Sequence, residues 1–223
     1  MNWNIVKGAC LALLPVAGTL KAQEKPNIVV ILADDLASNE ISCYGGKNLK
    51  TPNIDRIAEE GIRFTNNFAS CAMSVPIRAS LYTGLYPARH GSYQNHKISY
   101  SDIKSVTYYL PQAGYRVGRA GKTHTVPKSV FNFEKVPGFE ENCIAVTADY
   151  TVDGIRDFMR QDSPFCLFVC STLSHAPWTC GNKDEFDADK VILPPNCVDN
   201  KGTRELFRRL LAEIRALDNL SLI

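Results

Sequence analysis

The stretch NIVVILADD at residues 27–35 decides the fold class of this protein. Residues 27–33 form a run rich in β-branched and apolar side chains, which is typical of a strand buried on both faces of a parallel sheet. Asp34 and Asp35 follow at once, so two carboxylates stand where the strand ends. Ligands of open α/β sheets bind outside the carboxyl ends of the strands, and we therefore expect a binding site to begin here.

Strand and helix patterns alternate along the rest of the chain. A helix is predicted to begin at Pro52, with Thr51 as its N-cap and Gly61 as its stop. The other predicted helices cover residues 105–113, 152–159 and 203–217, and the other predicted strands cover residues 115–119 and 165–171. Residues 128–142 and 179–202 are irregular and are expected to be loops that shape a binding site. The alternation predicts an α/β fold, in which a mostly parallel central sheet has helices on both faces.

Composition limits the class of protein. The chain has 223 residues, of which 45% are hydrophobic and 22% are charged, so its bulk is expected to fold rather than stay disordered. Its 25 basic and 23 acidic residues give a net charge of +2. A dedicated nucleic-acid-binding protein would show a strong basic excess, and no nucleic-acid partner is expected.

The N-terminal residues have the pattern of a targeting segment. Lys7 supplies a positive charge, residues 9–20 are apolar, and Ala22 suits cleavage by signal peptidase. We predict a signal peptide over residues 1–22, a periplasmic or secreted location, and no transmembrane span once it is removed. The alternative is an N-terminal core helix or a retained anchor. The catalytic domain is then expected to cover residues 23–223.

The cysteines show no zinc-binding pattern. Of the eight in the chain, Cys10 lies in residues 1–22, and the other seven form no pair with zinc-ligand spacing. Cys166 and Cys170 lie in the apolar run FCLFVC and are expected to be small core residues. No disulfide pairing can be assigned from the sequence.

Polar side chains follow three of the predicted strands. Lys122 and His124 come after residues 115–119, and His175 comes after residues 165–171. Taken singly, each is most simply a loop residue or a solvated charge, and an Asp–Asp pair is most simply a turn. Taken together at one sheet edge, they indicate a site in which Asp34 and Asp35 reach one hard divalent cation.

The segment SVPIRASLYTG at residues 74–84 adds a candidate nucleophile. Pro76 can open a helix, which puts Ser74 at a helix N-terminus, where backbone N–H groups favour anions. Arg78 lies one helical turn further on and can neutralise an oxyanion. A nucleophile beside an arginine and a metal pair suits the ester of a tetrahedral anion. The alternative is an ordinary serine N-cap followed by a helix arginine.

With these residues in place, the sequence strongly resembles the sulfatase family of the alkaline-phosphatase-like superfamily. The signature of that family is matched by Ser74, Pro76, Arg78, Thr83 and Gly84. Four further stretches resemble family segments in the same order: PNIVVILADDL, TPNIDRIAEEGIRFTNNF, LPQAGYRVGRAGKTH and SHAPW. The similarity runs from about residue 26 to residue 220. It implies an alkaline-phosphatase-like fold and a sulfuric ester hydrolase.

The resemblance also implies a role for each site residue. Ser74 would be converted to formylglycine, whose hydrate attacks the sulfur of a sulfated glycan or an aryl sulfate. Calcium would be held by Asp34, Asp35 and Ser74. Arg78 would stabilise the formylglycine, Lys122 and His175 would bind sulfate or protonate the leaving oxygen, and His124 would promote elimination. A serine at position 74 implies a radical-type sulfatase-maturating enzyme as partner.

The sequence departs from the family pattern at several places. Position 77 is Ile rather than Ser or Ala, and Thr123 stands where the family has Trp. Family members run further and carry later metal ligands, so we expect this fold to be incomplete at its C-terminus and to expose apolar edges. Two alternatives remain: a phosphate or phosphonate ester hydrolase that uses unmodified Ser74, and an inactive truncated sulfatase.

Overall fold

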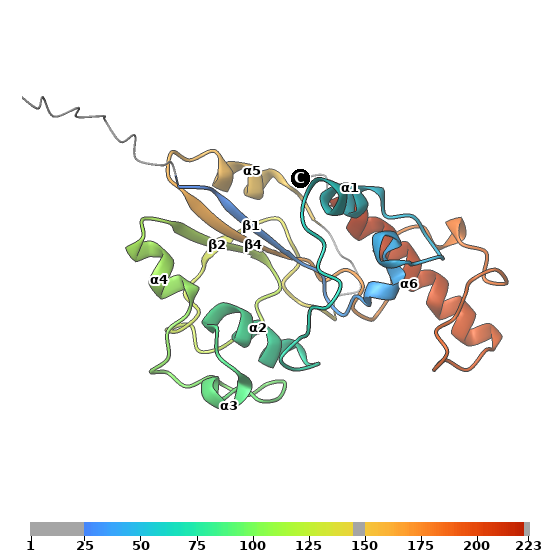
Figure 1. The fold of residues 1–223 in the computed structure, drawn as a ribbon, viewed down its shortest axis with the longest axis horizontal. Helices are drawn as coiled ribbons and strands as arrows, with labels where there is room; N and C mark the ends of the chain where they lie inside the picture. The colour runs from blue at the N-terminus through green and yellow to red at the C-terminus, as the bar shows by residue number, and fades with distance from the viewer. Residues whose placement is uncertain (1–24, 145–149, 221–223) are drawn as a thin grey trace, which may run out of the picture.

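The protein contains a four-stranded, entirely parallel sheet. The computed structural model describes residues 25–144 and 150–220, so the predicted signal peptide lies outside the described residues. The strands are β1 (Ile28–Leu32), β2 (Arg116–Gly121), β3 (Glu134–Val136) and β4 (Phe165–Cys170), in the spatial order β1-β4-β2-β3 (Figure 1). Each pair of neighbours is parallel, which confirms the predicted sheet.

Strand β1 lies at an edge of this sheet, and its predicted burial on both faces is wrong. Val29 and Ile31 keep 46% and 43% of their surface exposed. The alternate residues of β1 pack on the core, whereas every residue of the inner strand β4 is buried. Burial on two faces needs a covering layer on each side, and in the part of the chain that the structure describes, residues 25–144 and 150–220, only one side of β1 has one. The exposed pair agrees with the expectation of an apolar edge.

Helices cover both faces of the sheet, as the alternating pattern predicts. They are α1 (Pro52–Glu60), α2 (Ser74–Thr83), α3 (Pro87–His90), α4 (Val106–Gln112), α5 (Asp153–Met159) and α6 (Lys201–Leu220), with short 3-10 turns at Ser38–Glu40, Ser42–Tyr44 and Lys183–Glu185. Helices α2 and α4 pack on one face, and α5 packs on the other (Figure 1). The structure is therefore α/β with a parallel sheet between two helical layers.

Aromatic side chains fill the core between α2 and the sheet. Tyr82 is fully buried, and its ring meets those of Phe133 and Phe168 edge-on at centroid distances of 4.9 and 5.2 Å. Cys166 and Cys170 lie in the same cluster, which confirms them as core residues. Aromatic pairs in this geometry contribute about 0.5–1.5 kcal/mol each beyond their burial. This core fixes the position of α2 against the strand ends.

Helix α6 packs beside α1, to one side of the sheet (Figure 1). It is longer than the predicted 203–217 and buries Asp218 completely. The Asp218 carboxylate accepts hydrogen bonds from the backbone N–H groups of Asn53 and Ile54, at 3.1 and 2.9 Å. Thr51 makes no side-chain capping bond, although Pro52 occupies the first turn as predicted. The cap of α1 therefore comes from a distant helix, because Thr51 is engaged with Ser42 and Asp55 instead.

Two local features differ from the sequence prediction. Strand β3 lies inside the predicted loop 128–142, because three residues are too few to show a periodic pattern. Helix α2 begins at Ser74 itself, with Met73 as the N-cap residue, so Pro76 lies inside the first turn and does not open the helix. The second difference still leaves Ser74 at the N-terminus of α2.

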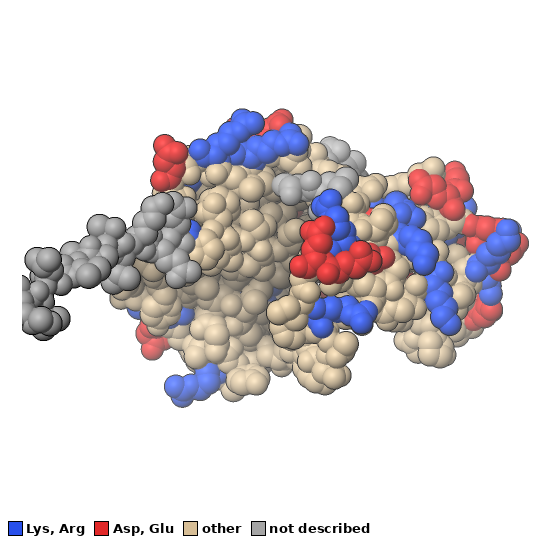
Figure 2. All heavy atoms as spheres, turned by 45° about the horizontal axis from the view of Figure 1, so that its top comes forward, with Lys and Arg blue, Asp and Glu red and all other residues tan. Residues whose placement is uncertain are grey.

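Charge is unevenly spread over the surface. In Figure 2 basic and acidic side chains are interspersed at the α6 end of the molecule, and a broad area over the sheet carries few of either. Among residues 25–144 and 150–220, no helix combines the length and the apolar character needed to cross a bilayer.

Candidate active site

Ser74 is held between a guanidinium group and an imidazole. Its Oγ lies 3.3 Å from Nε of Arg78 and 3.2 Å from Nδ1 of His124. Arginine can only donate, so the Ser74 hydroxyl accepts from Arg78 and is free to donate its own hydrogen to His124. That arrangement requires the His124 ring to carry its hydrogen on Nε2. Two segments separated by 50 residues thus meet at one hydroxyl.

Asp34 anchors the two cationic side chains of the site. The residue is only 3% exposed, and its two carboxylate oxygens lie 3.1 Å from Nη2 of Arg78 and 2.5 Å from Nζ of Lys122. Lys122 and Arg78 are themselves buried. Buried charges are stable only when paired, so the three side chains form one connected ionic group.

Ser74 and both acidic residues line one cavity. It has a volume of about 370 Å³, and Asp34, Asp35, Ser74 and Arg78 are among its lining residues. The Nη1 atom of Arg78 is buried and has no hydrogen-bond partner among the described residues. An unpaired buried donor is costly unless a ligand satisfies it. The cavity is therefore lined by a nucleophile and by a cationic side chain that can attract an anion.

Asp35 and His175 face each other at the rim of the site. The carboxylate of Asp35 lies 3.6 Å from Nε2 of His175, and Nδ1 of His175 lies 2.6 Å from the carbonyl oxygen of Ala176. A carbonyl only accepts, so Nδ1 carries a hydrogen and Nε2 is the atom turned toward Asp35. His175 does not contact Ser74 directly in this arrangement. All the residues predicted from the sequence nevertheless meet at one end of the sheet.

Strained backbone surrounds the site. The non-glycine residues with left-handed φ among those described are Asp35 (53°), His96 (65°), His124 (41°) and Ser174 (72°). Two of them are predicted site residues, and Ser174 directly precedes His175. Such conformations persist only where the surrounding structure holds them, and they cluster at functional sites.

Burial favours the neutral form of the His124 imidazole. Loss of solvent lowers the pKa of the imidazole below its ordinary value, and the positive charge of Lys122 lowers that pKa further. A neutral ring at neutral pH can accept the proton of the Ser74 hydroxyl. The ring of His96 lies 5.6 Å from that of His124, and no sequence motif pointed to this second histidine.

Two other side chains near the site were missed. Cys143 offers a sulfur atom within 4.8 Å of ligand atoms of Asp34 and His175, a set of donors that could hold a metal ion. Glu213 of α6 accepts hydrogen bonds from the backbone N–H groups of Ser174, Thr179 and Cys180, and so anchors the loop that carries His175. No motif could reveal either residue, because both act across long separations in the sequence.

The donors of the site suit a hard cation. Carboxylate and hydroxyl oxygens are the ligands that calcium prefers, and Asp34, Asp35 and Ser74 supply them. Calcium takes about six to eight oxygen ligands, which is more than these three residues provide, so water molecules would complete the set.

Comparison with known proteins places these observations in context. The family model described as Sulfatase matches residues 26–191. An ulvan-active sulfatase of Formosa agariphila is 38% identical over 161 residues, which are 70% of this chain and 31% of the relative. An N-acetylglucosamine-6-O-sulfatase of Bacteroides thetaiotaomicron is 32% identical over 192 residues, covering 76% of this chain and 34% of the relative. The chain thus spans about a third of the length of these relatives.

A solved structure gives the same result for the fold. It shows a protein in complex with its substrate D-glucosamine-2-N,6-O-disulfate, and it is 29% identical to this chain with a TM-score of 0.62. The match covers 78% of this chain and 40% of the other.

Proposed function

Since this chain belongs to the sulfatase family, we propose that it hydrolyses sulfate esters and that Ser74 provides the reacting side chain. The observation that carries this proposal is the position of Ser74 Oγ, between Arg78 and His124 and on the cavity that Asp34 and Asp35 also line. A nucleophile, an oxyanion partner and a base within hydrogen-bond reach are the parts that transfer of a sulfuryl group requires.

Each cationic or titratable side chain has a task in this proposal. Arg78, which lines the cavity, supplies positive charge to the sulfate oxygens, and Lys122 adds positive charge from the other side of Asp34. His124 takes a proton from the side chain at position 74. His175, at the rim, would donate a proton to the leaving oxygen from Nε2, which requires a ring that carries a hydrogen on both nitrogens.

We further propose that Ser74 is matured to formylglycine by a radical-type sulfatase-maturating enzyme. The hydrated aldehyde would supply one hydroxyl for the attack on sulfur and a second one for the release of sulfate. Asp34, Asp35 and the side chain at position 74 would hold calcium, which would supply positive charge to the sulfate oxygens. The hard oxygen donors of the cavity support this choice of metal.

Sulfated glycans are the proposed substrate class, with aryl sulfates as simple models. The support comes from the two relatives named for ulvan and for N-acetylglucosamine 6-O-sulfate, and from the solved complex with a disulfated glucosamine. We also propose that residues 1–22 direct residues 23–223 to the periplasm or to the outside of the cell, which N-terminal sequencing of the mature protein tests.

Mass spectrometry of the peptide that contains residue 74 tests the chemistry. The protein is produced with and without a radical-type maturase and assayed with an aryl sulfate and an aryl phosphate. We expect the peptide to lose two hydrogens and aryl sulfate to be hydrolysed only after co-expression, and Ser74→Ala to abolish both. An intact serine with phosphate ester turnover would instead establish the phosphatase alternative. A matured side chain without any turnover would establish the inactive alternative.

A further inference from the structure

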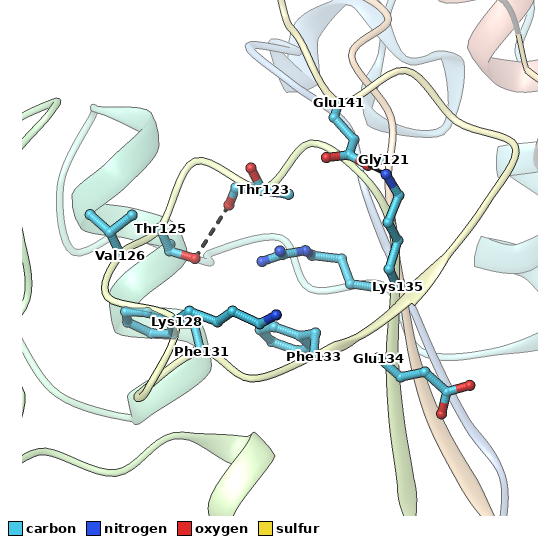
Figure 3. Close-up of a pocket in the computed structure, with 11 residues that line it drawn as sticks. Gly121, Thr123, Thr125, Val126, Lys128, Phe131, Phe133, Glu134, Lys135 and Glu141 are labelled. Carbon is cyan, nitrogen blue, oxygen red and sulfur yellow. Dashed lines mark hydrogen bonds and ion pairs between the residues drawn. The ribbon is translucent and has the colours of Figure 1, made fainter.

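A second cavity lies on the other side of the segment that carries Lys122 and His124. Its volume is about 250 Å³, and Figure 3 shows the side chains around it. Gly121, Thr123 and Thr125 line it, whereas Lys122 and His124 reach the candidate active site. Alternate residues of one segment therefore form a wall shared by the two sites.

The charges around this cavity do not balance. Its lining includes the basic residues Arg119, Lys128 and Lys135 and the acidic residues Glu134 and Glu141. Glu141 pairs with Lys135 at 2.5 Å, and Figure 3 shows the two side chains meeting at the edge of the group. Glu134 points away from the cavity in the same view and pairs with Arg116 at 2.5 Å. Within residues 25–144 and 150–220, no ion pair neutralises Arg119 or Lys128, so two positive charges remain.

The guanidinium of Arg119 is oriented but not satisfied. It lies 4.7 Å from the centroid of the Phe133 ring, which fixes its plane. Its Nη1 atom is buried and has no hydrogen-bond partner among the residues described. In Figure 3 the side chain of Lys128 extends over the Phe131 and Phe133 rings, with its amine toward the middle of the cavity. Arg119 and Lys128 line the same cavity and neither has an acidic partner among the described residues, so an anion bound there would supply an acceptor to both.

We propose that this cavity is a second oxyanion subsite, in which Arg119 and Lys128 bind a sulfate group. The volume is below the roughly 300–1,000 Å³ of pockets for drug-sized ligands, which favours a small anion. The choice of sulfate rests on the proposed function, because a sulfatase that acts on glycans meets this group in two forms. One form is the free sulfate that the reaction releases, and the other is a second sulfate ester on the same substrate.

Protection of Lys128 from acetylation tests the subsite at its own location. The full chain is treated with an acetylating reagent at increasing concentrations of inorganic sulfate, and peptide mass spectrometry follows Lys128 and the exposed Lys47. We expect sulfate to slow modification of Lys128 and to leave Lys47 unchanged. Sodium chloride at equal ionic strength controls for screening. Equal rates at Lys128 with sulfate and with chloride would overturn the proposal.

Arg116 offers a matched control on the same strand. It too stacks on an aromatic ring, at 4.2 Å from the Phe158 centroid, but it is already paired with Glu134. Arg119→Met keeps the aliphatic stem and should raise the sulfate concentration for half protection at least about tenfold. Arg116→Met should leave it unchanged. If Arg119→Met does not fold, Arg119→Lys is used, with an intermediate effect expected and an unchanged one contradicting the subsite.

Two sulfated sugars distinguish between the two possible ligands of the subsite, free sulfate and a second sulfate ester of the substrate. In a Ser74→Ala background, which prevents turnover, glucosamine 6-sulfate is compared with glucosamine-2-N,6-O-disulfate. If the subsite takes a second ester of the substrate, the disulfate should protect Lys128 at concentrations at least about tenfold lower. If it takes free sulfate, inorganic sulfate should protect Lys128 at the same concentrations as either sugar. Turnover is measured separately on the matured wild-type chain. Turnover there without protection of Lys128 would refute the subsite alone, whereas protection of Lys128 with no turnover by the matured chain would refute the proposed function alone.

Discussion

Glu213 offers a sharp test of how α6 supports the candidate active site. The residue is 2% exposed, and its carboxylate accepts three backbone hydrogen bonds, from Ser174 at 3.1 Å, Thr179 at 2.7 Å and Cys180 at 3.1 Å. Replacement by alanine removes all three acceptors. The N–H of buried Ser174 would bear a penalty of about 1–3 kcal/mol, and the other two, nearer to solvent, about 0.5–1 kcal/mol each. We expect Glu213→Ala to lower the free energy of unfolding by about 2–5 kcal/mol.

Glutamine at the same position separates the individual bonds. Thr179 and Cys180 share Oε1, and Ser174 donates to Oε2. Glu213→Gln can keep the shared acceptor and lose only the bond from Ser174, so we expect a loss of about 1–2 kcal/mol. Glu205→Gln on the same helix is the control. Its ion pairs with Arg208 and Arg209 are on the surface, and their loss should cost less than about 1 kcal/mol.

Urea denaturation measures these differences. With a slope of about 2 kcal/mol per molar urea, Glu213→Ala should move the midpoint down by about 1–2.5 M. Burial raises the pKa of Glu213 above its ordinary value, so the folded protein binds more protons than the unfolded chain between those two values. The contribution of Glu213 is therefore fully present at low pH and falls as the pH rises through this window, and Glu213→Gln should remove that slope. If Glu213→Ala shifts the midpoint no more than Glu205→Gln, the anchoring role is wrong.

Three other substitutions test separate parts of the fold. Asp218→Ala removes the acceptor that caps α1, and we expect the free energy of unfolding in urea to fall by about 2–4 kcal/mol. A change under about 0.5 kcal/mol would contradict the capping role. Burial lowers the pKa of His90, whose Nδ1 accepts the N–H of Ser92, so the free energy of unfolding should fall as the pH drops below the ordinary histidine pKa. His90→Gln should flatten this pH dependence. An unaltered plot of unfolding free energy against pH would exclude His90 as its source. Gly121→Ala would place Cβ 2.2 Å from the carbonyl oxygen of Cys170, at a φ of +82°. We expect the free energy of unfolding, measured by thermal unfolding, to fall by about 2–5 kcal/mol. An unchanged melting temperature would rule out this close approach.

Local patterns in the sequence determined the class of the fold and the content of the candidate site. Apolar runs predicted β1 and β4, and residues at strand ends and at one helix start included Asp34, Ser74 and Lys122. These features depend on side-chain periodicity and on turn chemistry over a few residues, which a single sequence displays. The structure brings these polar residues together because parallel strands present their carboxyl ends at one edge.

Only the tertiary structure decided how distant segments meet. The place of β1 at the sheet edge follows from pairing with β4, which lies more than 130 residues away, so an apolar run alone could not reveal that Val29 is exposed. The cap on α1, the anchor at Glu213 and the unpaired charge of Arg119 likewise depend on which side chains arrive from elsewhere. The physical reason is that burial and ion pairing are set by neighbours in space, whereas helix and strand patterns are set by neighbours along the chain.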